Sequence, residues 1–405
     1  MINFIEKGIC APKGFKANGI HCGIRKNTSK KDLAFILSDT ICHCAAIYTT
    51  NKVKGAPILV TKENIKNNKA RAVIVNSGNA NTCNADGIEK AEMMCEIASK
   101  ETGIDKTDIV VASTGVIGQI LPIEPIKNNI SELISGLDYN KNDDAANAIM
   151  TTDTVSKQCA VSFMISGKEC KMGAMAKGSG MINPNMATML CFITSDVLID
   201  ENLLKKALKE VADDTFNMVS VDGDTSTNDM AVILSNGMAE NKKIENKDED
   251  YNTFKKALYI LLENMSKKIA KDGEGATKLI ECKVYNAPSK ETAKKAAKSV
   301  IMSPLVKTAI FGEDANWGRI LCAIGYTDAE FPIDKVKIQI KSQYGSIIVC
   351  ENGAGVDFSE EKASEILKSD EITLLCDMDD GNFEATAWGC DLTYDYVKIN
   401  GDYRT

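Results

Sequence analysis

The sequence predicts a mixed α+β fold, and three observations carry that prediction. Short apolar runs separated by turn residues fill the first third of the chain, and a segment of helical periodicity lies between two of them. Two longer segments in the middle carry apolar residues at helical spacing, and the last part alternates apolar and polar residues in strand-sized runs. The 405 residues correspond to two or three domain-sized units, or to one large layered domain.

Five apolar runs of the first third are predicted to be strands, because each is short and bounded by turn residues. They are KDLAFILSD (31–39), CAAIYTT (44–50), GAPILVTK (55–62), RAVIVNSG (71–78) and DIVVASTG (108–115). Residues 87–103 carry apolar side chains at helical spacing and predict a helix with Gly103 as its C-cap. Strands and helices are therefore interleaved in this part of the chain.

Three helices are predicted further along the chain. They cover residues 200–218, where an acidic residue suits the positive end of the helix, residues 251–271, and residues 288–304, which open and close near prolines. The remaining runs alternate like the strands of an antiparallel meander. They are KVKIQIKSQ, GSIIVCENG, EITLLCDMDDG, NFEATAWGC and LTYDYVKIN.

The charge balance excludes several classes of partner. Lys and Arg number 48 against 56 Asp and Glu, which leaves a net charge of -8 and disfavours nucleic acid or an anionic membrane surface. The apolar runs are far shorter than the roughly 20 residues of a membrane-spanning helix. The first residues lack the apolar core of a secretory signal. We therefore expect a cytoplasmic protein without a nucleic-acid or membrane partner.

Histidine and cysteine usage argues against metal chemistry. The chain has two histidines, His21 and His43, so a histidine base or ligand would have to be one of them. The 14 cysteines include no CxxC pair. On a strand, Cys42 and Cys44 would share one face and His43 the other, so the three could not hold one ion. We expect reduced, buried, structural thiols and no metal site.

Residues 174–197, AMAKGSGMINPNMATMLCFITSDV, are the most informative segment. A flexible KGSG turn precedes Ala187 and Thr188, after which a strand-like run begins. Thr188 fits two interpretations: the first residue of a strand, since threonine is a β-former, or a nucleophile. A threonine hydroxyl needs a base, and its own α-amine, with a reference pKa of roughly 7.7–8.0, would supply one after cleavage of the preceding bond. That mechanism requires no histidine.

The segment KGSGMINPNMATML resembles the signature of the ornithine acetyltransferase family, the autoprocessed glutamate N-acetyltransferases of the cyclic arginine pathway. Further blocks that resemble the family follow one another in the same order from end to end. They are PKGFKANGI (12–20), NSGNANTCNADG (76–87), STGVIGQILP (113–122), IMTTDTVSK (149–157), DGEGATK (272–278), FGEDANWGRI (311–320) and INGDYRT (399–405). The resemblance covers essentially the whole chain.

The resemblance implies a fold and a processing event. The fold is the layered α/β/β/α sandwich of the ornithine acetyltransferase type with a smaller C-terminal lobe, here roughly 285–405. The chain cuts itself between Ala187 and Thr188 into an α chain, 1–187, and a β chain, 188–405. Two α and two β chains assemble into a heterotetramer.

The resemblance also implies a reaction and its residues. The acetyl group passes from N2-acetyl-L-ornithine to Thr188 and then to L-glutamate, in a ping-pong mechanism. Thr114 and Gly115 match the oxyanion hole. The substrate-binding positions are Thr151, Lys177, Thr188, Glu274, Asn400 and Thr405. For Thr151, the adjacent Thr152 is an alternative. The enzyme would need no cofactor, and acetyl-CoA is a co-substrate only in the bifunctional form.

Three alternatives stay open at this point. The transferase is either limited to acetylornithine or also uses acetyl-CoA to make N-acetylglutamate. An N-terminal-nucleophile aminopeptidase or amidohydrolase would share the chemistry of Thr188. A non-catalytic relative would stay uncut.

Overall fold

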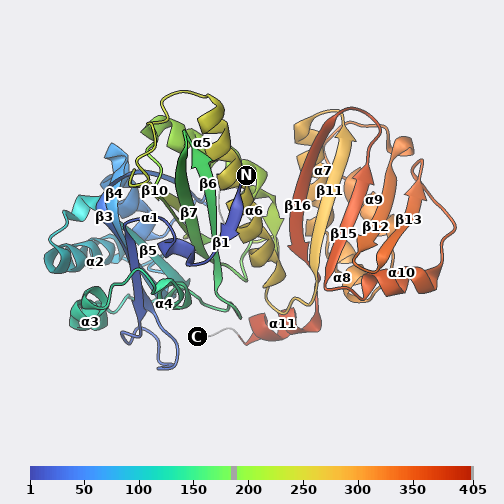
Figure 1. Ribbon diagram of the computed structural model, residues 1–405. Helices are drawn as coiled ribbons and strands as arrows, with labels where there is room; N and C mark the ends of the chain where they lie inside the picture. Colours follow the sequence, from blue (N-terminus) through green and yellow to red (C-terminus); the bar gives the residue numbers. More distant parts are fainter. Residues whose placement is uncertain (184–188, 403–405) are drawn as a thin grey trace. The chain divides into compact units, whose positions relative to one another are not determined.

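The computed structural model describes residues 1–183 and 189–402, so the predicted cleavage site at Ala187 and Thr188 and the predicted substrate contact at Thr405 lie outside the described residues. The chain forms two compact units (Figure 1). The first unit comprises Met1–Gly178, Pro184–Phe216 and Thr225–Met265, and the second comprises Ser179–Asn183, Asn217–Asp224 and Ser266–Thr405.

A nine-stranded sheet organises the first unit, in the order β1-β6-β7-β8-β10-β3-β4-β5, with β2 paired to β3. The strands are β1 (Asn3–Ile5), β2 (Phe15–Ile20), β3 (Leu33–Tyr48), β4 (Lys69–Asn79), β5 (Ile109–Val116), β6 (Lys157–Ile165), β7 (Lys168–Lys177), β8 (Leu190–Ser195) and β10 (Met230–Ser235). The β4–β5 and β8–β10 pairs are parallel and the other pairs are antiparallel.

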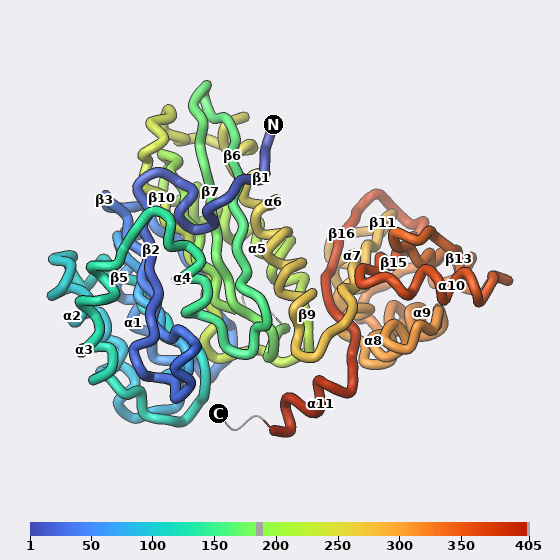
Figure 2. Tube along the Cα trace, turned by 60° about the horizontal axis from the view of Figure 1, so that its bottom comes forward, coloured from blue at the N-terminus to red at the C-terminus, as the bar shows by residue number. Residues whose placement is uncertain are grey.

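Helices cover both faces of this sheet. They are α1 (Ala56–Asn64), α2 (Gly87–Thr102), α3 (Glu124–Ser135), α4 (Asn142–Ala148), α5 (Glu201–Asp214) and α6 (Glu249–Lys271), the last of which continues into the second unit. Helices α2 and α3 pack against the face that carries Leu33 and Phe35, whereas α4 packs on the face that carries Ala34 and Ile36 (Figures 1 and 2). The side chains of β3 alternate between two apolar cores, as the period of a strand requires.

The second unit is built on a seven-stranded sheet in the order β14-β13-β12-β15-β11-β16-β9. Its strands are β9 (Val219–Ser220), β11 (Leu279–Ala287), β12 (Lys337–Ser342), β13 (Gly345–Glu351), β14 (Ala354–Gly355), β15 (Glu371–Asp377) and β16 (Phe383–Cys390). Its helices are α7 (Lys290–Met302), α8 (Pro304–Phe311), α9 (Trp317–Gly325), α10 (Glu360–Leu367) and α11 (Tyr394–Gly401). Helix α7 packs on β11 and β16, and α10 packs on β12 and β13 (Figure 2).

The α+β class with a smaller second unit, formed mainly by C-terminal residues, is confirmed. Helices α2, α5, α6 and α7 lie where helical periodicity predicts them. Gly103 ends α2 in the left-handed conformation, with φ 70°. These elements agree with the sequence because their local signals, apolar period and caps, are strong.

The predicted strand at 55–62 is wrong, because Ala56–Asn64 form helix α1. Gly55 takes an extended conformation at the N-cap, and the proline that follows lies in the first helical turn, where its fixed φ suits a helix and its missing N–H costs nothing. The two strands predicted at 31–39 and 44–50 are one long strand, β3, whose pairing with β4 shifts register between Leu37 and Cys42.

The predicted antiparallel meander is also wrong in two respects. Strand β11 lies between β15 and β16 and is parallel to β15, so the second sheet is mixed. The last run, LTYDYVKIN, forms helix α11 rather than a strand. Strand β16 already pairs with β11 on one side and with β9 on the other, so the segment after it finds no free edge beside it.

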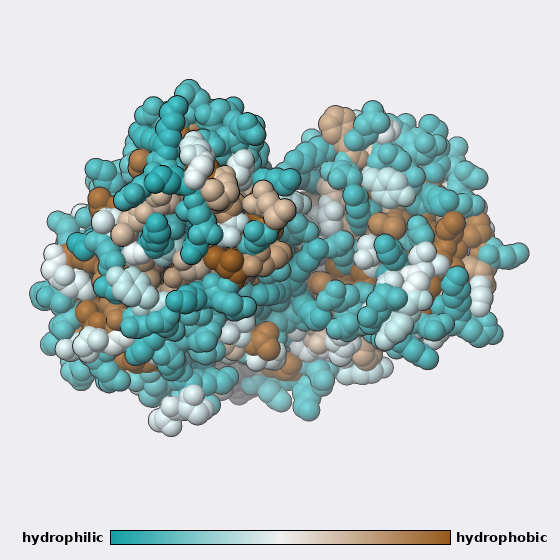
Figure 3. Space-filling model, in the orientation of Figure 1, coloured by the Kyte–Doolittle hydropathy of each residue, from teal (hydrophilic) through white to brown (hydrophobic). Residues whose placement is uncertain are grey.

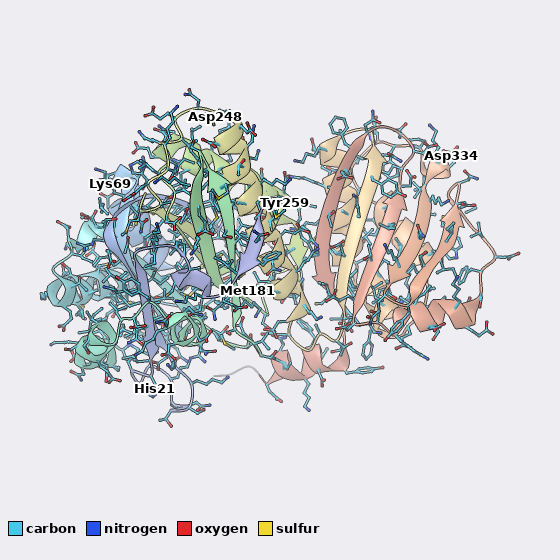
Figure 4. The ribbon with its side chains drawn as sticks, in the orientation of Figure 1. His21, Lys69, Met181, Asp248, Tyr259 and Asp334 are labelled. Atoms are coloured by element: carbon cyan, nitrogen blue, oxygen red, sulfur yellow. The ribbon has the colours of Figure 1, made fainter. Side chains whose placement is uncertain are left out.

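The Cys42–Cys44 prediction is confirmed: both thiols are buried in one core, and Nδ1 of His43 donates to the carbonyl of Ile199 over 2.7 Å. His21 lies in the loop after β2 (Figure 4) and contacts the carbonyl of Lys30 over 2.9 Å. The 14 cysteines are present as free thiols.

Figure 3 shows that hydrophilic side chains predominate on the face in view. Among the described residues, no helix is both long and apolar enough to cross a bilayer.

Candidate active site

The predicted oxyanion residues lie at the end of β5 in the first unit. Thr114 is buried, and Gly115 has a φ of 135°, which side chains rarely adopt. Gly115 pairs in register with Gly78 of β4, and a Cβ at Gly115 would overlap the backbone of Gly78. Only glycine therefore allows the two strands to approach this closely. A turn of this kind can direct backbone N–H groups toward a developing oxyanion.

A buried polar network holds this oxyanion turn in place. Nδ2 of Asn228 donates to the carbonyls of Ala80 and Ser113, over 2.6 and 2.9 Å. Its Oδ1 accepts from Thr82 and Thr227, each over 2.6 Å. Because all these groups are buried, each hydrogen bond replaces one that water would otherwise make. The asparagine-rich block 76–87 thus supports the turn that carries the predicted oxyanion residues, and Asn228 is a residue that sequence reasoning missed.

Asp153 brings two predicted substrate-binding positions together. Its Oδ2 accepts from the backbone N–H of Thr151 over 2.9 Å, and its Oδ1 accepts from the N–H of Gly178, the residue after Lys177, over 2.8 Å. Oδ1 also accepts from Nζ of Lys157 over 2.6 Å, and both side chains of that ion pair are fully buried. One carboxylate therefore fixes the Thr151 loop relative to the end of β7. The sequence offered no signal for this role, because Asp153 is one acid in a polar run.

The charge of Asp153 depends on its cationic neighbours. Burial alone would raise the pKa of this carboxyl, but attraction by Lys177 and Lys157 and the hydrogen bonds that it accepts hold its pKa well below the ordinary value. Asp153 is therefore a carboxylate at neutral pH. Its negative charge lies within electrostatic reach of Lys177, the predicted anchor for a substrate carboxylate.

We expect Asp153→Asn to lower the free energy of unfolding by about 3–5 kcal/mol, because Lys157 would lose the carboxylate that faces it inside the protein. The folded pKa of Asp153 is depressed, so the carboxylate stabilises the folded protein at neutral pH, and this stabilisation is lost as pH falls through the acid range. The free energy of unfolding of Asp153→Asn should therefore depend less on pH in that range than that of the wild type. Urea unfolding from neutral to acid pH measures both effects.

Glu63→Gln provides the matched control, because Glu63 pairs with Lys66 on the surface, where both side chains are about 70% exposed. An exposed pair contributes at most about 1 kcal/mol. Equal stability losses in Asp153→Asn and Glu63→Gln would contradict a special role for the buried pair.

Two contacts connect the oxyanion turn with the Thr151 loop. Oγ of Ser77 donates to the carbonyl of Ala148 over 2.7 Å. The guanidinium of Arg25 donates to the carbonyl of Met150, and its stem packs against Gly78. The loop that carries Arg25 is itself held by buried Asp32, which accepts the N–H of Arg25 over 2.9 Å. The predicted oxyanion and substrate-binding residues of the first unit thus belong to one connected region.

The strand that follows the predicted nucleophile lies beside Lys177. Leu190, two residues after Thr188, pairs in register with Lys177 on β7 and with Met230 on β10. Met230 follows Asp229, a buried acid whose Oδ2 has no hydrogen-bond partner among the described residues. Burial raises the pKa of Asp229 well above its ordinary value. Hydrogen bonds from Ser226 and attraction by Lys177 lower this pKa, but their effect is smaller than that of burial. Asp229 is a second acid that sequence reasoning missed.

Two further predicted substrate-binding residues meet in the second unit. Nδ2 of Asn400 on α11 donates to Oε2 of Glu274 over 2.8 Å. The backbone N–H of Glu274 donates to the carbonyl of Ser179 over 3.1 Å, and a Cβ at Gly180 would overlap the Glu274 carboxylate. A side chain in place of Gly180 in the KGSG turn would therefore displace the Glu274 carboxylate.

Helix α11 is attached to the Gly-rich turn that carries Glu274. Oγ1 of Thr393, the residue before α11, donates to the carbonyl of Gly275 over 2.6 Å. Gly275 has a φ of 69°, and a Cβ there would lie 2.6 Å from the backbone nitrogen of Tyr396. The DGEGATK block thus positions both members of the Glu274–Asn400 pair. Among the residues that the structure describes, no group of three or more His, Cys, Asp or Glu could hold a metal ion.

The comparison with known families decides the affiliation. The model of the ArgJ family matches residues 16–405. The chain belongs to the ArgJ family. The chain is 51% identical over its whole length to the arginine biosynthesis bifunctional protein ArgJ of Caldanaerobacter subterraneus, of which it also covers 100%. It is 52% identical to the bifunctional protein ArgJ 1 of Clostridium acetobutylicum, over 99% of this chain and 98% of that protein.

A solved structure of the family agrees with the fold. The crystal structure of the arginine biosynthesis bifunctional protein ArgJ from Bacillus halodurans matches with a TM-score of 0.50 and 46% sequence identity. The match covers 52% of this chain and 98% of the crystallised chain. The similarity of this chain to a solved ArgJ structure confirms the predicted fold of the ornithine acetyltransferase type.

Proposed function

We propose that this ArgJ family member is a self-processing acetyltransferase of arginine biosynthesis. It cuts the Ala187–Thr188 bond and then transfers the acetyl group of N2-acetyl-L-ornithine to L-glutamate through an acetyl-Thr188 intermediate. The observation that carries the proposal is the similarity to proteins named arginine biosynthesis bifunctional protein ArgJ, 51% identical over 100% of both chains. Because those relatives are named bifunctional, we extend the proposal to acetyl-CoA-dependent synthesis of N-acetylglutamate.

The topology of the first sheet supports the proposed cut. Strands β8 and β10 follow residue 188, yet they lie between β7 and β3, which precede residue 187. Strand β8 is hydrogen-bonded to β7, and β10 is hydrogen-bonded to β3. Two fragments joined by complete strand ladders on both sides would stay together after the bond is cut. The Bacillus halodurans chain, covered almost entirely by about half of the present chain, also fits a protein that exists as two pieces.

Each proposed step needs one proton carrier and one oxyanion site. In the first half-reaction the Thr188 hydroxyl forms a C–O bond to the acetyl carbon, and its α-amine takes the hydroxyl proton and passes it to the leaving amine of ornithine. In the second half-reaction the amine of glutamate forms a C–N bond to the acetyl carbon, the C–O bond to Thr188 breaks, and the α-amine passes the proton from the glutamate amine to the Thr188 oxygen, which restores the hydroxyl. Both tetrahedral intermediates would place their negative oxygen at Thr114 and Gly115.

The charged residues suit substrates that are α-amino acids. Lys177 would bind the α-carboxylate that ornithine and glutamate share, and an ammonium–carboxylate hydrogen bond is stronger than a neutral one. Glu274, oriented by the 2.8 Å hydrogen bond from Asn400, would bind a cationic amine of the substrate. Thr151 and Thr405 complete the proposed set of substrate contacts. The chemistry proposed here uses no cofactor or metal.

The experiment that tests the proposal joins a mass measurement to a transfer assay. The purified protein should give two fragments under denaturing conditions, with the larger one beginning at Thr188, and a single particle under native conditions, a heterotetramer of two α and two β chains. Acetylornithine and glutamate should yield ornithine and N-acetylglutamate, and acetyl-CoA should replace acetylornithine. A single uncut 43.9 kDa chain would contradict the processing step.

The same assay separates the alternatives. Release of acetate or cleavage of peptides faster than transfer to glutamate would identify a hydrolase of the N-terminal-nucleophile type. Failure with acetyl-CoA alone would restrict the enzyme to acetylornithine. The free thiols fit the reducing cytoplasm, which is where we place the reaction.

A further inference from the structure

The five residues just before the undescribed cleavage segment are held at many points. Ser179 donates through Oγ to the carbonyl of Asp272 over 2.7 Å, and its own carbonyl accepts the N–H of Glu274. Ile182 accepts through its carbonyl from the N–H of Val221 over 2.7 Å. Asn183 donates through Nδ2 to the carbonyl of Gly223 over 3.0 Å. This segment, 179–183, is therefore fixed to parts of the chain that follow the proposed cut.

Asp222 makes the most concentrated contact with segment 179–183. Its Oδ2 accepts from the N–H of Met181 over 2.6 Å, and its Oδ1 accepts from the N–H of Ile182 over 2.9 Å. Oδ1 also accepts from the N–H of Asp224 over 3.2 Å, which holds the carboxylate in its own turn. One side chain thus determines the direction of two consecutive peptide groups.

The backbone at Met181 needs such support. Met181 (Figure 4) has a φ of 56°, in the left-handed region that residues other than glycine seldom adopt. A conformation of this kind persists when the surroundings hold it, and it often occurs where function requires a defined geometry. The carboxylate of Asp222, which accepts the Met181 N–H, is the group that holds it.

We propose that Asp222 is a positioning residue for self-cleavage, which fixes segment 179–183 so that the Ala187 carbonyl can be presented to the Thr188 hydroxyl. This inference rests on the proposed function, because it concerns the same processing event. Attack of a hydroxyl oxygen on the carbonyl carbon of the preceding residue requires a defined distance and direction between these two atoms. A small displacement of either atom slows such a step strongly. A carboxylate that fixes the chain five residues before Ala187 limits the conformations from which the attack must start.

The test compares Asp222 variants with a neighbour in the same turn. Asp222→Ala removes both acceptors, and Asp222→Asn keeps the size of the side chain and one carbonyl oxygen. Asp224→Asn is the matched control, since it removes an equal charge from an exposed side chain, while the Asp224 contact to Asp222 uses the backbone N–H. The conversion of the 43.9 kDa chain into two fragments is followed over time by intact mass after synthesis.

We expect Asp222→Ala to be processed roughly 10- to 100-fold more slowly than wild type, with Asp222→Asn in between and Asp224→Asn unchanged. Melting temperatures in a Thr188→Ala background, which stays uncut, show whether the Asp222 variants fold. If Asp222→Ala fails to fold, the rate of Asp222→Asn decides. Processing of a folded Asp222 variant at the wild-type rate would overturn this inference, whereas a wild-type protein that is never cut would overturn the proposed function instead.

Discussion

Thr188→Ala is expected to remain a single 43.9 kDa chain and to lose acetyl transfer completely. Without the hydroxyl there is no group to attack the Ala187 carbonyl, so no N-terminal threonine forms. The same hydroxyl is the proposed acceptor of the acetyl group, so acetyl transfer is also lost when the hydroxyl is removed. Intact mass and an assay of N-acetylglutamate formation measure the two losses separately.

Thr188→Ser serves as the control for this prediction, because serine retains the hydroxyl at the same position. It should be cut and should keep measurable transfer. Two fragments from Thr188→Ala would show that another protease or another bond is responsible. Transfer activity in uncut Thr188→Ala would remove Thr188 from the mechanism.

Gly115→Ala should lower kcat roughly 10²- to 10³-fold, the loss typical when an oxyanion site is disturbed. The added methyl group would overlap the backbone of Gly78, and alanine at a φ of 135° is strained, so the turn that carries Thr114 and Gly115 would have to move. The effect should fall on kcat more than on KM, because the oxyanion exists only in the transition state and the intermediates.

Gly118→Ala is the matched control, since Gly118 follows in the same loop. It also has a positive φ, 79°, but a Cβ there would meet nothing within 4 Å. It should cost about 1 kcal/mol of stability from the backbone conformation and leave kcat near the wild-type value. Equal losses of kcat in the two variants would show that strain in the loop, not the Gly115–Gly78 contact, controls activity.

Local signals predicted the elements that carry strong periodicity. Helix α2 was predicted together with its C-cap at Gly103, and strands β4 and β5 follow from their apolar runs. The prediction failed at 55–62 and 392–400, where short apolar runs fit a strand or a helix equally well. Helix α11 was decided by its neighbours, because both edges of β16 are occupied, whereas helix α1 has a local signal, a proline in its first turn, that the strand prediction overlooked.

The candidate site was predicted only where the chain carries a recognisable signature. Thr114, Gly115, Thr151, Lys177, Glu274 and Asn400 are named from resemblance to a family. The structure pairs Gly115 with Gly78, bonds the Thr151 backbone to Asp153, and bonds Asn400 to Glu274. Asp153, Asp222 and Asn228 were missed because each also binds a backbone group far away in sequence. Asp153 binds a peptide group 25 residues later, and Asp222 binds one 41 residues earlier. No local spacing encodes such contacts.

The sequence by itself determined the mixed α+β class and the family, and it predicts a threonine nucleophile, Thr188, whose chemistry would need neither of the two histidines. Only the tertiary structure decided which strand pairs would hold the two proposed fragments together and which buried acids lie beside the predicted site residues. The physical reason is that strand pairing and buried hydrogen bonds join residues distant along the chain. The insertion of β8 and β10 between β7 and β3 is such an arrangement, because it pairs both edges of β8 and both edges of β10.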